Sequence, residues 1–134
     1  MTVVVDTSAL LAMLLGEPEA TRFGELLQDE TPAISAGSLI ETLRVVMRRR
    51  GERARAEVYD LLGTFEVKIE PVDEAQVALA EDGHIRFGKG RGRAPAVLNL
   101  GDLFAYALAR KLDAPLLFKG NDFAQTDIKP ALPA

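Results

Sequence analysis

The stretch VVVDTSALLAMLLG, residues 3–16, passes directly from a run of valines to a run of helix-forming residues. The valines predict a buried strand over residues 2–6. The hydroxyl side chains after Asp6 can cap a helix that continues to Leu15, and Gly16 is a natural end for that helix. A strand followed at once by a helix is the repeating unit of an α/β fold. Asp6 stands at the junction between the strand and the helix.

The same alternation of strand and helix continues along the chain. Apolar or alternating runs predict three further strands, over residues 33–35, 66–70 and 116–118. Helical spacing of apolar residues, with caps and glycine stops, predicts helices over residues 18–29, 38–50, 52–62, 75–87 and 100–111. Strands separated by helices predict a parallel sheet with right-handed crossovers, covered on both faces. The expected fold is therefore an α/β fold, a three-layer α/β/α sandwich around a short, mainly parallel sheet.

Length and composition limit the class of protein. The chain has 134 residues, of which 48% are hydrophobic, and this suits a single domain over residues 1–134. It contains no cysteine, which excludes disulfides and thiolate chemistry, and its solitary histidine, His84, argues against a zinc site. No segment has the pattern of a signal peptide or the length of a membrane span. We therefore expect a cytoplasmic protein with no membrane partner.

Charge is distributed unevenly along the chain. The formal net charge of −4 argues, by itself, against a constitutive nucleic-acid binder. Two clusters depart from that average: the first holds Arg44, Arg48, Arg49, Arg50, Arg53 and Arg55, and the second holds Arg86, Lys89, Arg91 and Arg93. Such runs are often only solvated surface. Because the two clusters lie beside two of the acids considered next, they favour a basic rim that contacts a nucleic-acid backbone.

Four acidic residues stand where the predicted fold would bring them together. Asp6 ends the first strand and Asp122 closely follows the last, where buried parallel strands deliver side chains to a crevice. Glu41 and Asp102 lie near the starts of two predicted helices. Carboxylates held close together repel, so a cluster that stays ionised near neutral pH needs a cation. Ligands that are all oxygen favour Mg²⁺ or Mn²⁺.

Each acid also has an ordinary structural explanation. Asp6 can cap the first helix, and Ser38-Leu39-Ile40-Glu41 matches the capping-box pattern. Asp102 is favoured by the helix dipole in a first helical turn, and Asp122 ends a Gly-Asn-Asp sequence that is typical of turns. The residue types leave both interpretations open for each acid, although it is harder for all four structural explanations to hold at once than for any one.

Several segments together resemble one known family. VVVDTSALLAMLLGE, AGSLIETLRVV, NLGDLFAYALARKLDAPLLFKG and NDFAQTDI occur in the order and at the spacing of PIN-domain ribonucleases, specifically the VapC toxins of bacterial toxin–antitoxin pairs. The resemblance covers nearly the whole chain. The Asp-Thr-Ser-Ala start is moderately specific, whereas GDLFAYALA followed by APLLFKGNDF is highly specific. This resemblance implies that the chain has a PIN-like fold and is a metal-dependent endoribonuclease.

The resemblance also implies roles for the four acids. Asp6 and Asp102 would be direct ligands of Mg²⁺ or Mn²⁺, and Asp122 would help to hold the same ion. Glu41 would contact a second ion or the attacking water, from which it accepts a proton. In-line attack on an RNA phosphodiester would then leave a 5′-phosphate and a 3′-hydroxyl.

Neighbouring residues carry over with some departures. Thr7 and Ser8 would hold Asp6 or a water at the ion. Many relatives have a second acid where this chain has Asn121, which leaves the number of metal ions open. One branch has His-Pro near the end of the basic loop, where this chain reads Arg93-Ala94-Pro95.

The resemblance implies two kinds of macromolecular partner. One is the RNA substrate, whose backbone would contact Arg44, Arg48, Lys89, Arg91 and Arg93. The other is a VapB-type antitoxin, whose C-terminal segment would occupy the crevice with an arginine near the acids. A homodimer of the toxin and a toxin–antitoxin hetero-oligomer are the expected assemblies.

Two other classes of protein remain open. A phospho-acceptor receiver domain also places acids at strand ends, but it needs an acidic pair near the end of the first strand, and Asp6 has no acidic neighbour. A catalytically silent PIN-like module that only binds another protein would keep the fold without the chemistry. Because all four acids are present, the nuclease is favoured over both.

Overall fold

The computed structural model describes residues 1–92 and 96–133. Four strands form one sheet: β1 (Thr2–Val5), β2 (Thr31–Ser35), β3 (Lys68–Glu70) and β4 (Leu116–Leu117). They are ordered β3-β2-β1-β4, and every pair of neighbours is parallel. In this register Val4 of β1 lies between Ala33 and Leu116. The prediction of a short parallel sheet is confirmed.

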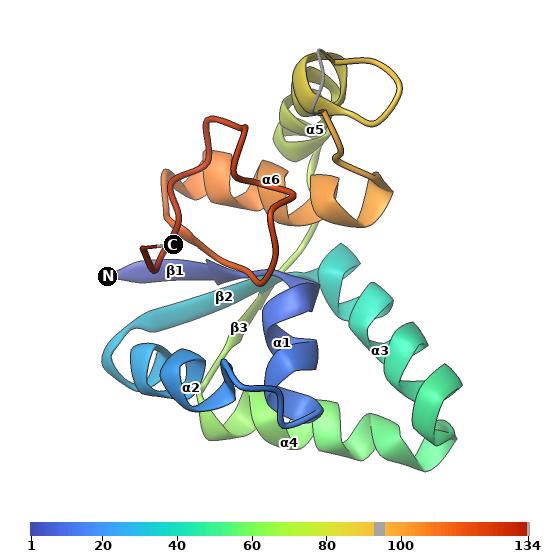
Figure 1. The fold of residues 1–134 in the computed structure, drawn as a ribbon, viewed down its shortest axis with the longest axis vertical. Helices are drawn as coiled ribbons and strands as arrows, with labels where there is room; N and C mark the ends of the chain where they lie inside the picture. The colour runs from blue at the N-terminus through green and yellow to red at the C-terminus, as the bar shows by residue number, and fades with distance from the viewer. Residues whose placement is uncertain (93–95, 134) are drawn as a thin grey trace.

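Helices cover both faces of this sheet. They are α1 (Thr7–Leu14), α2 (Ala20–Asp29), α3 (Ala36–Arg50), the 3₁₀ turn η1 (Glu52–Ala54), α4 (Arg55–Thr64), α5 (Glu74–Phe87) and α6 (Leu100–Leu112). Figure 1 shows α1 to α4 below the sheet and α5 and α6 above it. The layers are therefore those predicted. Within the described ranges, no helix is long and apolar enough to cross a membrane.

Two hydrophobic cores, one on each face, explain the run of valines in β1. Val3 and Val5 pack into the core beneath the sheet with Ile34 and residues of α1 to α4. Val4 points to the opposite face and packs with Tyr106 and other residues of α6. Successive side chains of a strand point to opposite faces, so a strand that is covered on both sides needs consecutive apolar residues.

The start of α3 differs from the prediction, with a consequence for Glu41. The helix begins at Ala36 because the hydroxyl of Ser35 caps it, accepting a hydrogen bond from Gly37 N at 3.2 Å. Ser38 is therefore inside the helix rather than at its N-cap. The predicted capping box between Ser38 and Glu41 is wrong, and the Glu41 carboxylate does not cap the start of α3.

Other element boundaries agree with the prediction to within three residues. β3 begins at Lys68 rather than residue 66, because the chain leaves α4 through a turn in which Glu66 has a φ of 52°. β2 begins at Thr31 rather than residue 33. The side chain of Asp73 caps α5 and that of Asn99 caps α6.

A close approach between α3 and α6 joins the two layers beside the carboxyl ends of the strands. A Cβ atom at Gly37 would overlap the ring of Phe104. Only glycine allows the first turn of α3 to lie this close to α6. The contact places the helix that carries Glu41 beside the helix that carries Asp102, as the adjacent starts of α3 and α6 in Figure 1 show.

Candidate functional site

The four acids come from four separate elements at the carboxyl edge of the sheet. Asp6 follows β1, and its N–H donates to Leu117 O of β4 at 3.0 Å. Glu41 lies in the second turn of α3, and Asp102 lies in the first turn of α6. The carboxylates of Asp6, Asp122 and Glu41 all raise the pKa of Asp102. Asp102 is therefore within electrostatic reach of the other three acids.

Asp6 uses its two oxygens differently. The side chain is 4% exposed, and Oδ2 caps α1 by accepting from Ser8 N at 3.0 Å and Ser8 Oγ at 2.6 Å. Oδ1 is buried and has no hydrogen-bond partner among the described residues. Burial raises the pKa of Asp6 to about 6, with a further contribution from Glu41. The capping explanation is thus correct for one oxygen, while the other has no partner in the described part of the chain.

Asp102 divides its oxygens in a similar way. It forms a capping box with Asn99: Asp102 N donates to Asn99 Oδ1 at 2.9 Å, and Asn99 N donates to Asp102 Oδ2 at 3.1 Å. Oδ1 remains the oxygen through which Asp102 can reach a ligand. Burial, followed by the neighbouring carboxylates, raises the pKa of Asp102 to about 7. The capping box that the sequence suggested at Ser38 is found here instead.

The Glu41 carboxylate lies against the backbone of α6. A Cβ atom at Gly101 would overlap Glu41 Oε2, so the carboxylate occupies the space that any other residue at position 101 would fill. Gly101 immediately precedes Asp102. Sequence reasoning missed Gly101, although a glycine in the first turn of a strong helix, where it weakens the helix, is a signal for a close approach.

The hydroxyl groups of Ser8 and Thr7, the predicted neighbours of Asp6, have different hydrogen-bond partners. Ser8 Oγ donates to Asp6 Oδ2 and accepts from Lys119 N at 2.9 Å, so it joins β1 to the chain that follows β4. Thr7 Oγ1 instead donates to Ser38 O at 3.0 Å and accepts from Thr42 Oγ1 at 3.2 Å. Thr7 therefore fixes α1 against α3. The Ser38 hydroxyl, which the capping-box pattern assigned to the helix start, is instead buried without a partner in the described ranges.

Asp122 differs from the other acids in being exposed. It lies on the loop after β4, where Ala124 N donates to Asn121 O at 3.1 Å, as the turn interpretation expects. Two contacts fix this loop: the buried Phe123 packs on Phe118 with ring centroids 5.2 Å apart, and Asp127 accepts from Tyr106 OH at 2.8 Å. Asp122 is thus held at the edge of the cluster by its neighbours.

A divalent cation fits this donor set. The facing groups are carboxylates only, and a buried carboxylate oxygen without a donor, Asp6 Oδ1, is a natural ligand for a hard cation. In residues 1–92 and 96–133, no three His, Cys, Asp or Glu side chains lie close enough together to hold a metal ion as they stand. A cation would relieve the repulsion between the carboxylates around Asp102.

The two basic clusters are only partly available for a ligand. Arg44 and Arg48 are exposed on α3, and a rise of about 1.5 Å per residue puts Arg48 about 10 Å along the helix from Glu41. Lys89 and Arg91 are exposed after α5, whereas Arg93 lies outside the described residues. Other members pair with acids: Arg50 Nη1 lies 3.1 Å from Glu57, and Arg86 Nη1 lies 3.0 Å from Asp82 and 3.3 Å from Asp127.

Comparison with known proteins identifies the family. Residues 3–129 match the PIN domain family. The chain is 39% identical over 129 residues to Ribonuclease VapC42 of Mycobacterium tuberculosis, which covers 96% of this chain and 98% of that protein.

Two solved structures share the fold. One is the crystal structure of Mycobacterium tuberculosis VapC20, described as a Sarcin-Ricin loop cleaving toxin, with a TM-score of 0.77, 20% identity, and coverage of 98% of this chain and 99% of that one. The other is VapBC2 from Rickettsia felis bound to a DNA fragment from their promoter, with a TM-score of 0.75, 14% identity, and coverage of 97% and 96%. A receiver domain is excluded, and this chain belongs to the PIN-domain family as a protein of the VapC type.

Proposed function

We propose that this protein is a Mg²⁺- or Mn²⁺-dependent endoribonuclease toxin of a VapBC toxin–antitoxin pair, and that it leaves 5′-phosphate and 3′-hydroxyl ends. The observation that carries the proposal is the buried Oδ1 of Asp6, which has no partner within the described chain, with the carboxylates of Glu41 and Asp102 within electrostatic reach of Asp6. The similarity to Ribonuclease VapC42 over nearly the whole chain supports the same function.

The four acids would have two different roles in the reaction, metal binding and proton acceptance. A bound Mg²⁺ or Mn²⁺ would supply the positive charge that neutralises the phosphoryl oxygens and acidifies the attacking water. Asp6, Asp102 and Asp122 would hold it, the first two through the oxygens that their helix caps leave available. Glu41 would accept the proton of the attacking water, from a position fixed by its contact with Gly101. Ser8 would keep Asp6 oriented by occupying Oδ2.

Exposed basic residues would hold the RNA strand. Arg44 and Arg48 on α3, with Lys89 and Arg91 after α5, lie on elements that flank the acids, and Arg93 would extend the second group. Contacts to phosphate add affinity without reading the sequence. Because Arg44 is nearer to Glu41 than Arg48 is, we assign it the larger share of contact with the cleaved strand.

A VapB-type antitoxin is the proposed protein partner. Its C-terminal segment would enter the acidic crevice and place an arginine near the carboxylates, whose mutual repulsion a guanidinium relieves as a metal ion does. Similarity to the VapBC2 structure of Rickettsia felis supports such a pairing. We propose a homodimer of this chain and a hetero-oligomer with the antitoxin as the assemblies.

The competing function is a catalytically silent module that only binds another protein. Nothing in that function requires a buried carboxylate oxygen without a hydrogen-bond donor, whose burial is unfavourable. A silent module would be free to replace any of the four acids. The presence of all four beside Ser8 and Gly101 favours the nuclease.

Cleavage of structured RNA tests the proposed function. Purified protein is incubated with a transfer RNA pool and with ribosomal RNA in Mg²⁺, with and without EDTA, beside Asp6→Asn and Asp102→Asn variants. Asparagine keeps a capping oxygen and removes the charge, so both variants should remain folded. We expect metal-dependent cleavage with 5′-phosphate ends by the wild type and a loss of at least a hundredfold in each variant. Absence of cleavage by the wild type, or full activity in the variants, contradicts the proposal.

A further inference from the structure

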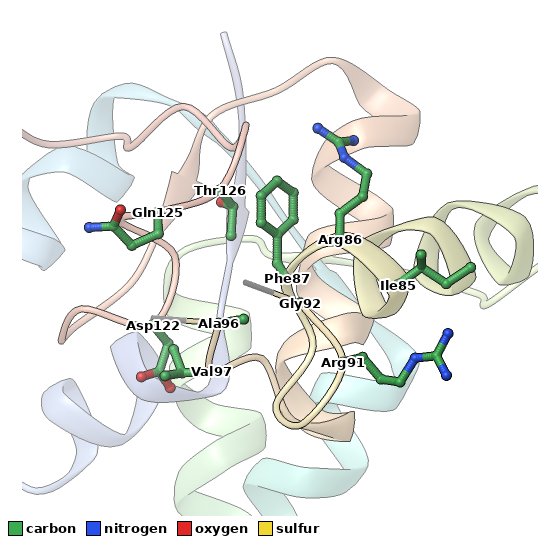
Figure 2. A pocket seen from close by; sticks show the side chains of 10 residues that line it. All are labelled: Ile85, Arg86, Phe87, Arg91, Gly92, Ala96, Val97, Asp122, Gln125 and Thr126. Carbon is green, nitrogen blue, oxygen red and sulfur yellow. The ribbon is translucent and has the colours of Figure 1, made fainter. Parts of the chain in front are cut away.

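A cavity of about 500 Å³ lies beside the acidic cluster, between the C-terminal end of α5 and the loop that follows β4. Figure 2 shows the side chains of Phe87, Gln125 and Thr126 around it, with Asp122 beside Val97 on one side. Asp122 belongs both to this cavity and to the acidic cluster. A ligand in the cavity would therefore lie next to the acids that are proposed to cleave the RNA.

Arg86, one of the two arginines that line the cavity, does not favour an anion there. The Arg86 guanidinium is already paired with Asp82 and Asp127, and it lies 4.7 Å from the centroid of the Phe87 ring. Asp122 adds a negative charge at the edge. A phosphate group near Asp122 would meet its carboxylate while Arg86 stays bound to two others, and the Arg91 side chain points away from Asp122 in Figure 2. An uncharged ligand suits this wall better.

The remaining surface combines an apolar face with one adaptable polar group. Phe87 is half-buried, and its ring packs at one side on Tyr106 with centroids 6.2 Å apart. The hydroxyl of Thr126 is committed to the loop, since it donates to Phe123 O at 2.8 Å and accepts from Ile128 N at 3.2 Å. The exposed carboxamide of Gln125 supplies both a donor and an acceptor.

We propose that this cavity receives a nucleobase of the RNA strand next to the cleaved phosphate, with the base against Phe87 and its edge hydrogen-bonded to Gln125. Single-stranded RNA is read through such contacts, with bases stacked on aromatic rings and hydrogen-bonded along their edges. The cavity has the size of a small-molecule site. The inference rests on the proposed ribonuclease function and adds to it the residues that select the sequence at the cut.

Base preference at the cut tests the assignment. The variants are Gln125→Ala and Phe87→Leu, and the matched controls are Gln28→Ala, an exposed glutamine on α2, and Phe65→Leu, a half-buried phenylalanine of the other core. Each protein cleaves a pool of random-sequence single-stranded RNA in Mg²⁺, and the ends are sequenced. We expect a preference at one position beside the cut for the wild type and both controls. Both variants should lose that preference. An unchanged preference in both variants overturns the assignment.

A binding measurement separates this inference from the nuclease proposal. Fluorescent eight-nucleotide RNAs, each with one abasic position, are titrated in EDTA and followed by anisotropy. We expect one abasic position to weaken binding to the wild type roughly tenfold and to leave both variants unaffected. If the wild type cleaves no RNA, the nuclease proposal fails, and this measurement still decides the cavity. Equal affinity of the wild type for intact and abasic RNA overturns the inference. It is also overturned if Gln125→Ala and Phe87→Leu bind these RNAs as the wild type does and are weakened only in binding the antitoxin.

Discussion

The carboxylate of Glu41 lies directly against Gly101, so that a β-carbon at position 101 would overlap Oε2. This contact spans α3 and α6, which pack closely because Gly37 also has no side chain to meet Phe104. Because Gly37 and Gly101 have no side chain, α3 can place Glu41 beside the first turn of α6. The proposed proton acceptor and the proposed metal ligand Asp102 are positioned by the same helix contact.

Alanine at position 101 should move Glu41 without unfolding the protein. The added methyl group overlaps the end of a flexible side chain, and alanine is the better helix former by up to about 1 kcal/mol. We expect Gly101→Ala to lower the cleavage rate at least tenfold and to leave the melting temperature unchanged or slightly raised. Gly63→Ala is the matched control, because a β-carbon there meets nothing within 4 Å. Equal rates for the two variants would show that Glu41 needs no fixed position.

Stability should fall as the pH rises from about 4 to about 7 in the absence of metal. Burial raises the pKa of Asp6 to about 6 and that of Asp102 to about 7, from an ordinary value of 3.8. In this window the folded protein binds more protons than the unfolded chain, so the free energy of unfolding decreases with increasing pH. Asp6→Asn removes one of these charges. We expect the variant to exceed the wild type by roughly 1 to 3 kcal/mol near neutral pH in urea unfolding with EDTA.

The same comparison at low pH supplies the control. Near pH 4 the Asp6 carboxyl is protonated in the folded protein, and the advantage of Asp6→Asn should disappear. Asp60→Asn, which changes an exposed acid on α4, should follow the wild type at both pH values. An advantage of Asp6→Asn that does not depend on pH would mean that the carboxylate is ionised throughout.

Added Mn²⁺ should stabilise the protein more at higher pH. Protons and the cation compete for Asp6 and Asp102, because both carboxyls must ionise before they bind metal. We expect the rise in melting temperature caused by Mn²⁺ to be larger near pH 8 than near pH 5, since a ligand stabilises the state that binds it. Asp102→Asn should abolish most of this rise and Asp60→Asn should not. A rise that is the same at both pH values would place the bound ion elsewhere.

Periodicity and caps in the sequence were sufficient to predict the fold. The consecutive valines of β1 mark a strand that is covered on both sides, and the structure buries Val3, Val4 and Val5 on alternate faces. The start of α3 was harder to predict, because Ser35 and Ser38 are equally good caps and the choice depends on how far β2 extends. Packing against Phe104 favours the earlier start, and no local pattern reveals that contact.

The sequence was sufficient to select the acids but not to predict which oxygen of each carboxylate caps a helix. It treated capping and metal binding as alternatives for Asp6 and Asp102, whereas each residue caps a helix with Oδ2 and leaves Oδ1 available. A residue type reveals that a carboxylate is present, and only geometry reveals which oxygen is already bonded. The contact between Glu41 and Gly101 was not predicted for the same reason, since these residues are 60 positions apart in the sequence.

Ser8 should be required for the orientation of Asp6. Its hydroxyl donates to Asp6 Oδ2 and accepts from Lys119 N, so Ser8→Ala removes one bond from the carboxylate and leaves a backbone donor without its partner. We expect a loss of about 1 kcal/mol in the free energy of unfolding and a Mn²⁺ affinity reduced at least fivefold. Thr64→Ala, which removes a hydroxyl bonded only to Asp60 O, is the control for stability. If Ser8→Ala lost stability but bound Mn²⁺ as tightly as the wild type, Ser8 would serve the fold alone.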